Sequence, residues 1–168
     1  MGIVNLEYKL FLYYKIYKGG KLINSIINEY MKKKAIISVR SFNDLDEKDV
    51  IEVITPGEFL VSDEGYKAIY EETEISGMGG TTTTLTMLDD KFILEREGNV
   101  TTKMDFKKGE TSILLYNTPY GAIDMQLYTK DLKVDISEDG GNIEAEYSME
   151  LSGQAPIKTK LSVNVKIN

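Results

Sequence analysis

The chain contains neither cysteine nor histidine among its 168 residues. Without histidine it has no imidazole for acid–base catalysis, and without cysteine it has no thiolate nucleophile. The usual zinc and copper ligands are absent as well, so we expect no metal site and no cofactor. A disulfide scaffold is excluded, which suits a reducing compartment, and we therefore expect a cytoplasmic protein.

Long apolar runs are also scarce. The longest apolar run near the start, residues 10–14, is flanked by Lys9 and Lys15. A signal peptide needs a longer apolar core, and a spanning helix needs about twenty apolar residues. We therefore expect no membrane span.

Residues 1–33 differ in composition from the rest and are predicted to be an N-terminal extension of a single domain, residues 34–168. One interpretation is that Met31 is the true translation start and that the upstream residues are an annotation extension. The other is a basic, aromatic and amphipathic helix over residues 6–17 that lies on a membrane or covers an edge of the fold.

Charge is unevenly distributed along the chain. Residues 1–34 carry seven lysines against two glutamates, whereas residues 35–168 carry thirteen basic against twenty-five acidic side chains. The domain should therefore repel anionic membranes and the phosphate backbone, and no nucleic-acid partner is expected. The sequence contains no signal for an oligomeric state.

The clearest secondary-structure signal is the alternation of apolar or threonine side chains with polar ones over residues 157–167, which is typical of a strand with one wet face. Weaker versions of this pattern, separated by Gly, Asp and Asn turns, recur from residue 34 onward. The predicted strands are residues 35–42, 50–61, 66–74, 81–88, 92–97, 100–106, 111–117, 122–128, 132–137, 142–151 and 156–167. So many antiparallel strands must close or fold into two sheets, and we predict an all-β, closed, antiparallel up-and-down barrel.

Two motifs fail on inspection. Residues 44–49 resemble the start of a calcium loop, but a lysine occupies a ligand position and the obligatory glycine is missing. Residues 76–80 are rich in glycine, but they join two strands and lack the Gly-Lys-Ser/Thr of a phosphate-binding loop.

Pro56 and Gly57, within one long strand, are expected at a bulge or corner.

Strand parity singles out Glu72 and Arg96. Glu72 shares a strand face with Tyr70, and Arg96 shares one with Phe92 and Leu94, so both charges point to the apolar side. A buried charge needs a partner, and the two side chains are predicted to pair inside the barrel. The pair is either an internal salt bridge that only fixes strand register or an anchor for a polar ligand group, for which arginine offers a planar fork.

A second group lies at residues 116–121, where Pro119 forces a tight connection between two tyrosines. Their rings either plug the end of the barrel or line a ligand cavity. The predicted ligand-binding residues of the lumen are Tyr70, Glu72, Arg96, Tyr116, Thr118 and Tyr120.

Several of these residues, together with Thr129 and Tyr147, occur in an order and spacing that resembles a known family. The elements are 70–72 (Tyr-Glu-Glu), 96–98 (Arg-Glu-Gly) and 118–121 (Thr-Pro-Tyr-Gly). The similarity is to the YwiB-like family of bacterial proteins of unknown function, and it covers residue 34 to the C-terminus. It implies a calycin-like, lipocalin-related barrel in a cytoplasmic bacterial protein and implies no reaction.

These observations lead to three hypotheses. The first is a barrel that binds a small, partly apolar molecule in its lumen. The alternative is a structural or protein-interaction barrel with a filled core. A protein-interaction barrel would expose an apolar patch on its outer wall. An enzyme that uses Glu72 with Arg96 is the weakest of the three.

Overall fold

The computed structural model describes residues 32–44, 50–62 and 65–168. These residues form ten antiparallel strands and one short 3₁₀ helix, which confirms the all-β prediction. The elements are β1 (Lys32–Asn43), β2 (Val50–Ser62), β3 (Gly65–Glu71), η1 (Glu74–Ser76), β4 (Thr81–Met87), β5 (Phe92–Gly98), β6 (Thr102–Phe106), β7 (Thr111–Thr118), β8 (Gly121–Ser137), β9 (Gly140–Leu151) and β10 (Ile157–Ile167).

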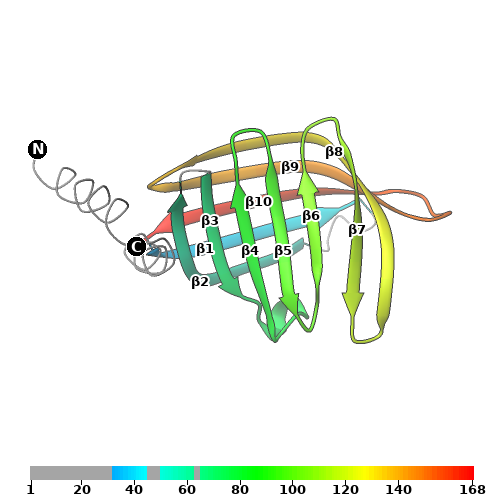
Figure 1. The fold of residues 1–168 in the computed structure, drawn as a ribbon, viewed down its shortest axis with the longest axis horizontal. Coiled ribbons are helices and arrows are strands. Elements are labelled where there is room, and N and C mark those ends of the chain that lie inside the picture. The colour runs from blue at the N-terminus through cyan, green and yellow to red at the C-terminus, as the bar shows by residue number, and fades with distance from the viewer. Residues whose placement is uncertain (1–31, 45–49, 63–64) are drawn as a thin grey trace, which may run out of the picture. The chain divides into compact units, whose positions relative to one another are not determined.

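The strands form one sheet in the order β6-β5-β4-β3-β2-β1-β10-β9-β8-β7. Each strand pairs with its neighbours in the chain, except that β6 and β7 are the two ends of this order, and β1 also pairs with β10. Figure 1 shows how the sheet curls: β3 to β6 cross in front of β1, β10 and β9. This is the up-and-down barrel that the strand pattern predicts.

The barrel is nearly closed, not fully closed as predicted. Its first and last strands in sheet order, β6 and β7, are joined by an isolated bridge between Thr101 and Asn117, with reciprocal backbone hydrogen bonds of 3.0 and 2.9 Å. Toward the other end the Ser112 hydroxyl donates to the Asp105 carbonyl at 3.0 Å. Between these two contacts no backbone ladder between β6 and β7 is found in the described residues, and we call this gap the seam.

The prediction of separate strands at 122–128 and 132–137 was wrong. Both belong to β8, which continues through a bulge between Thr129 and Asp131. Lys130 is the extra residue, because Thr129 pairs with Tyr147 and Asp131 with the preceding residue of β9, Glu146. A bulge bends a strand without ending its pairing, so a polar break in the pattern does not produce a turn here.

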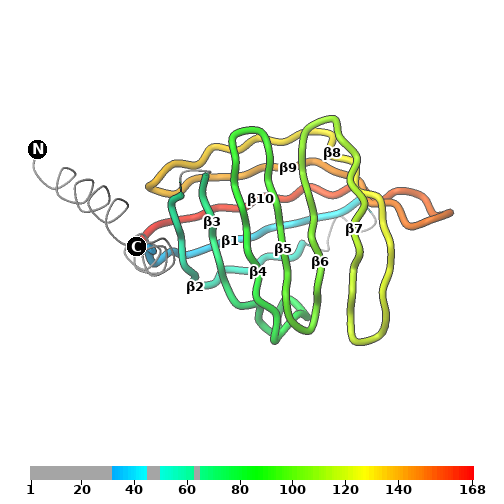
Figure 2. Tube along the Cα trace, viewed as in Figure 1, coloured from blue at the N-terminus to red at the C-terminus, as the bar shows by residue number. Residues whose placement is uncertain are grey.

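The corner predicted at Pro56 and Gly57 is confirmed. Pairing of β2 with β3 begins at Glu58, and Figure 2 shows that β2 changes direction along its length. A Cβ atom at Gly57 would lie 2.5 Å from the Ile69 carbonyl oxygen, so only glycine fits this close approach.

The interior is ordered in rows, because residues in register on neighbouring strands point the same way. At one end Tyr66, Met87, Phe92 and Phe106 lie opposite one another across β3 to β6. Phe92 stacks on Phe106, whose ring meets Tyr147 edge to face. The next row, Ala68, Leu85, Leu94 and Met104, is also buried, so this end of the barrel is filled with apolar side chains.

The predictions for residues 1–31, and for the loop at 45–49, fall outside the described residues. Within the part of the chain that is described, no helix has the length and apolar character needed to cross a bilayer.

Candidate functional site

The third row of the barrel interior is polar. Tyr70, Thr83, Arg96 and Thr102 lie directly opposite one another on β3, β4, β5 and β6. Tyr70, Thr83 and Thr102 are buried, and the Arg96 side chain is 15% exposed. A continuous polar row behind two apolar rows divides the interior into an apolar end and a polar end.

Glu72 completes this polar end. Strand β3 stops at Glu71, but the Glu72 amide still donates to the Thr81 carbonyl at 2.8 Å, which keeps the side chain in parity with Tyr70. Its carboxylate, with the side chain only 1% exposed, accepts the Thr83 hydroxyl at 2.6 Å and lies 3.5 Å from Arg96 Nε. The predicted pairing of Glu72 with Arg96 is therefore confirmed.

Two tyrosines of the interior hold their protons more tightly than usual. Burial raises the pKa of Tyr70, and the nearby Glu72 carboxylate raises it further. Burial also raises the pKa of Tyr147, although the Arg96 charge opposes this shift. Both hydroxyls therefore stay neutral at physiological pH and act as hydrogen-bonding groups, not as anions.

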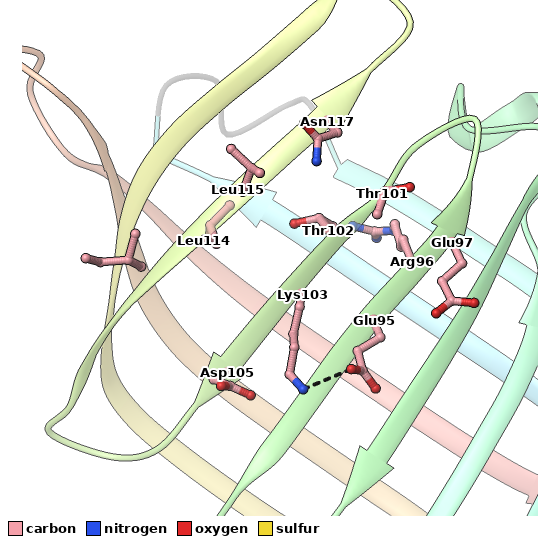
Figure 3. Close-up of a pocket in the computed structure, with 11 residues that line it drawn as sticks. Glu95, Arg96, Glu97, Thr101, Thr102, Lys103, Asp105, Leu114, Leu115 and Asn117 are labelled. Carbon is pink, nitrogen blue, oxygen red and sulfur yellow. Dashed lines mark ion pairs between the residues drawn. The ribbon is translucent and has the colours of Figure 1, made fainter.

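A pocket of about 340 Å³ opens at the seam between β6 and β7. Its wall combines residues of β5, β6 and β7 with those of the Thr101–Asn117 bridge (Figure 3). The lining residues are Glu95, Arg96, Glu97, Thr101, Thr102, Lys103, Asp105, Ile113, Leu114, Leu115 and Asn117.

Three of these lining residues belong to the inward-facing set: Arg96, Thr102 and Leu114. Thr102 is 4% exposed and Leu114 is 2% exposed and part of the apolar core. In Figure 3 the Arg96 side chain extends behind β6 toward Thr102. The pocket therefore lies on the wall at the seam and borders three residues of the inward-facing set.

The rim of the pocket is formed by outward-facing side chains. Lys103 pairs with Glu95 at 3.0 Å, and Asp105 lies 3.4 Å from the ammonium group of Lys91. Ile113 and Leu115 of β7 are exposed beside them. The rim thus mixes ion pairs with apolar surface.

Three residues that line the pocket carry a buried side-chain atom with no hydrogen-bond partner among the described residues. One is Asp105 Oδ1, an acceptor that lies 3.4 Å from the Lys91 ammonium group. The other two are Arg96 Nε and Thr102 Oγ1. Their residues are register partners on β5 and β6. Nearly all buried donors and acceptors in folded proteins are paired, so two unpaired groups side by side at a pocket indicate a place for an external hydrogen-bonding atom.

The other residues predicted for the ligand site lie outside the lining of the pocket. Tyr70 and Glu72 are buried behind Arg96 and do not line the pocket, while Tyr116 packs against the core. The Thr118 hydroxyl is used in the hairpin turn, where it donates to the Gly121 carbonyl at 3.1 Å and accepts the Tyr120 amide at 3.1 Å.

Tyr120 was wrongly placed in the lumen, since it is 99% exposed. Only residues 119 and 120 separate the paired Thr118 and Gly121, so they form the turn itself. Strand parity does not extend to turn residues, and the Tyr120 ring projects beyond the strands.

Thr102 and Leu114 were missed. Thr102 shares parity with the buried Met104 and Phe106, and Leu114 with Tyr116, so the alternation could have placed both inside. Their meeting across the seam depends on the approach of β6 to β7, which the local pattern does not contain. Groups of three or more acidic side chains able to hold a metal are absent from the described part of the chain.

Comparison with known proteins agrees with this fold. The chain is 26% identical over 108 residues to the uncharacterized beta-barrel protein YwiB of Bacillus subtilis (strain 168), which covers 64% of this chain and 74% of that protein. The crystal structure of the ywiB protein from Bacillus subtilis matches with a TM-score of 0.72 at 21% identity, covering 82% of this chain and 94% of that chain. The resemblance stated from the sequence is thus confirmed.

The family model that matches the chain extends over residues 37–163, well over half of its length. The matched range runs from within β1 to within β10 and so contains the seam, the polar row and the pocket. The chain belongs to the family described as Domain of unknown function (DUF1934).

Proposed function

We propose that this barrel binds a small, partly apolar molecule at the polar end of its interior, which the molecule enters through the seam. The observation that supports the proposal best is the composition of the pocket wall. Arg96, Thr102 and Leu114, all inward-facing, line the same pocket. A few polar groups that converge in a concave, partly apolar site are characteristic of small-molecule sites.

The volume of the pocket sets the size of the ligand. A pocket of about 340 Å³ lies at the lower end of the range of known ligand sites, roughly 300–1,000 Å³. The apolar end of the lumen is occupied by Phe59, Phe92 and Phe106, which are fully buried. The ligand must therefore be small and confined to the polar end and the seam.

A pair of substitutions on β7 tests the proposal. An apolar fluorescent probe should bind the wild-type protein with one-to-one stoichiometry. Leu114→Trp should fill the pocket and abolish binding, whereas Thr111→Trp adds the same ring to an exposed, outward-facing position of β7 that does not line the pocket and should leave binding unchanged. Equal binding by both variants would place the probe elsewhere and reject the proposal.

A protein-interaction barrel is the second hypothesis, and the outer wall supports it. Ile113 is 79% exposed and Leu115 48% exposed on the same face of β7, and Tyr128 of β8 is 45% exposed. Ile113→Lys with Leu115→Lys should remove this apolar patch while leaving Leu114 in place. Loss of a binding partner together with unchanged probe binding would favour the interaction hypothesis for this surface.

Catalysis by Glu72 has less support. Its carboxylate is turned toward Thr83 and Arg96 and is shielded from the pocket. A general acid or base must reach the proton that it transfers, directly or through one water, and Glu72 faces protein groups instead.

A further inference from the structure

We infer that the ligand is an uncharged molecule with a carbonyl-type oxygen, such as an amide, ester or ketone, which accepts hydrogen bonds from Arg96 Nε and Thr102 Oγ1. This inference rests on the proposed function and adds the chemical class of the ligand. It depends on which buried atoms lack partners and on the charges that surround them.

The unpaired atoms require an acceptor. Arg96 Nε carries a hydrogen and can only donate, and the Thr102 hydroxyl can donate as well. Neither is bonded within the described structure, although both are buried and their residues lie opposite each other. A single ligand oxygen with two lone pairs satisfies both donors, whereas an apolar group satisfies neither.

Glu72 does not already fill this role. Its Oε1 atom receives the Thr83 hydroxyl at 2.6 Å, and although it lies 3.5 Å from Arg96 Nε the two atoms are not hydrogen-bonded. The Glu72 carboxylate therefore compensates the positive charge of Arg96 but does not accept a hydrogen bond from its Nε–H group. The ligand has to supply an acceptor but no charge.

A carboxylate ligand would introduce a second anion next to Glu72. Two negative charges that are both buried and held close together repel strongly in the low dielectric of a protein interior. The rim adds to this repulsion, because three carboxylates line the pocket, those of Glu95, Glu97 and Asp105, against the two basic side chains of Arg96 and Lys103. The domain as a whole is acidic, with thirteen basic and twenty-five acidic residues over positions 35–168. These charges favour a neutral ligand.

The remaining pocket wall suits an apolar body. Leu114 lies at the inner wall, and Ile113 and Leu115 lie on the outer side of the same strand. A short aliphatic chain attached to the carbonyl group would run from the polar row past Leu114 and leave through the seam.

Hexanamide and hexanoate test the inference, because they share one chain and differ in charge. At neutral pH hexanamide should bind, and hexanoate should bind at least about tenfold more weakly because of the second buried anion. Thr102→Val should weaken hexanamide binding about fivefold, since it removes one donor and keeps the shape. Thr86→Val, at an outward-facing threonine of β4 that does not line the pocket, is the matched control and should leave the affinity unchanged.

Glu72→Gln gives the sharpest result. Glutamine can still accept the Thr83 hydroxyl, but the Arg96 charge is then uncompensated, and the preference should change from hexanamide to hexanoate. If this variant does not fold, the wild-type protein provides the same test. Binding of the acid should strengthen as the pH falls through the pKa of free hexanoic acid, while hexanamide binding stays constant.

The outcomes separate the two claims. Tighter binding of hexanoate than of hexanamide by the wild type, with both blocked by Leu114→Trp, would overturn the inference and leave the proposed function intact. Absence of binding by hexanamide, hexanoate and the fluorescent probe would contradict both.

Discussion

The Glu72 carboxylate lies 3.5 Å from Arg96 Nε although the whole of β4 separates their strands. Thr83 of β4 fills the interval and donates its hydroxyl to the same carboxylate at 2.6 Å. The ion pair therefore spans three neighbouring strands at the polar end of the barrel.

A double-mutant cycle tests the strength of this pair. Glu72→Met or Arg96→Met alone should lower the free energy of unfolding by about 3–5 kcal/mol, because the remaining charge is stranded in a low dielectric. Replacement of both should cost much less than the sum. Urea unfolding of the wild type, the two single variants and the double variant gives the coupling energy. The hydrogen bond from Thr83 is lost in both variants that lack Glu72, so its contribution cancels from the cycle. Strictly additive losses would show that the two charges do not interact.

Gly98 should not tolerate a side chain. Its φ is +135°, and a Cβ atom there would overlap the Gly80 carbonyl oxygen on the neighbouring chain segment. Gly98→Ala should therefore lower stability by about 2–3 kcal/mol or more, through strain in a sparsely populated conformation and through this overlap. Gly109→Ala is the control, since Gly109 has φ +78° and open space around its Cβ position. Thermal unfolding that shows the Gly109 variant to be the less stable of the two would contradict this explanation.

The two tyrosines near the β7–β8 turn should behave differently. Tyr116 packs against the core and Tyr120 is fully exposed. We expect Tyr116→Ala to cost about 2–4 kcal/mol, because it leaves a cavity. Tyr120→Ala should stay within about 0.5 kcal/mol of the wild type, as is usual for surface positions. Chemical denaturation measures both, and a large loss for Tyr120→Ala would mean that its ring is buried in solution.

Tyr70 should make the protein sensitive to alkali. Burial and the Glu72 carboxylate raise its pKa above the ordinary value of 10.0, so the folded state holds the proton more tightly than the unfolded state. The stabilisation is complete below the unfolded pKa and is lost as the pH rises above it. Melting temperatures from about pH 9 to pH 11 should therefore fall less steeply for Tyr70→Phe than for the wild type. Tyr120→Phe serves as the exposed control, and identical slopes for Tyr70→Phe and wild type would refute the assignment.

Removal of residues 1–30 should leave the melting temperature nearly unchanged. The described barrel contains its first strand, β1, paired with β10 from Ala35 to Asn43. A large loss of stability would contradict the interpretation of Met31 as the translation start. A liposome pull-down that compares the full-length and truncated proteins tests the alternative of a membrane-bound helix, for which only the full-length protein should sediment.

Strand parity explains why much of the interior was predictable. A period of two assigns each side chain to one face from its own strand alone, so the inward direction of Arg96 and Glu72 follows from Phe92, Leu94 and Tyr70. Their contact then needed only the rule that buried charges pair. The up-and-down order followed from connections too short for crossovers.

The features that were missed depend on contacts between distant segments. The bulge at Thr129 keeps β8 continuous only because β9 pairs with it on both sides of the irregularity. The seam forms because β6 and β7 meet through Thr101 and Asn117 and then separate, which no local pattern encodes. For this reason the local pattern does not predict the pocket at the seam.

A crystal structure of the protein with hexanamide tests the binding site most directly. We expect the amide oxygen within about 3 Å of both Arg96 Nε and Thr102 Oγ1, with the aliphatic chain against Leu114. Hexanamide bound only on the outer surface of Ile113 and Leu115, or with its amide directed away from Arg96, would contradict it.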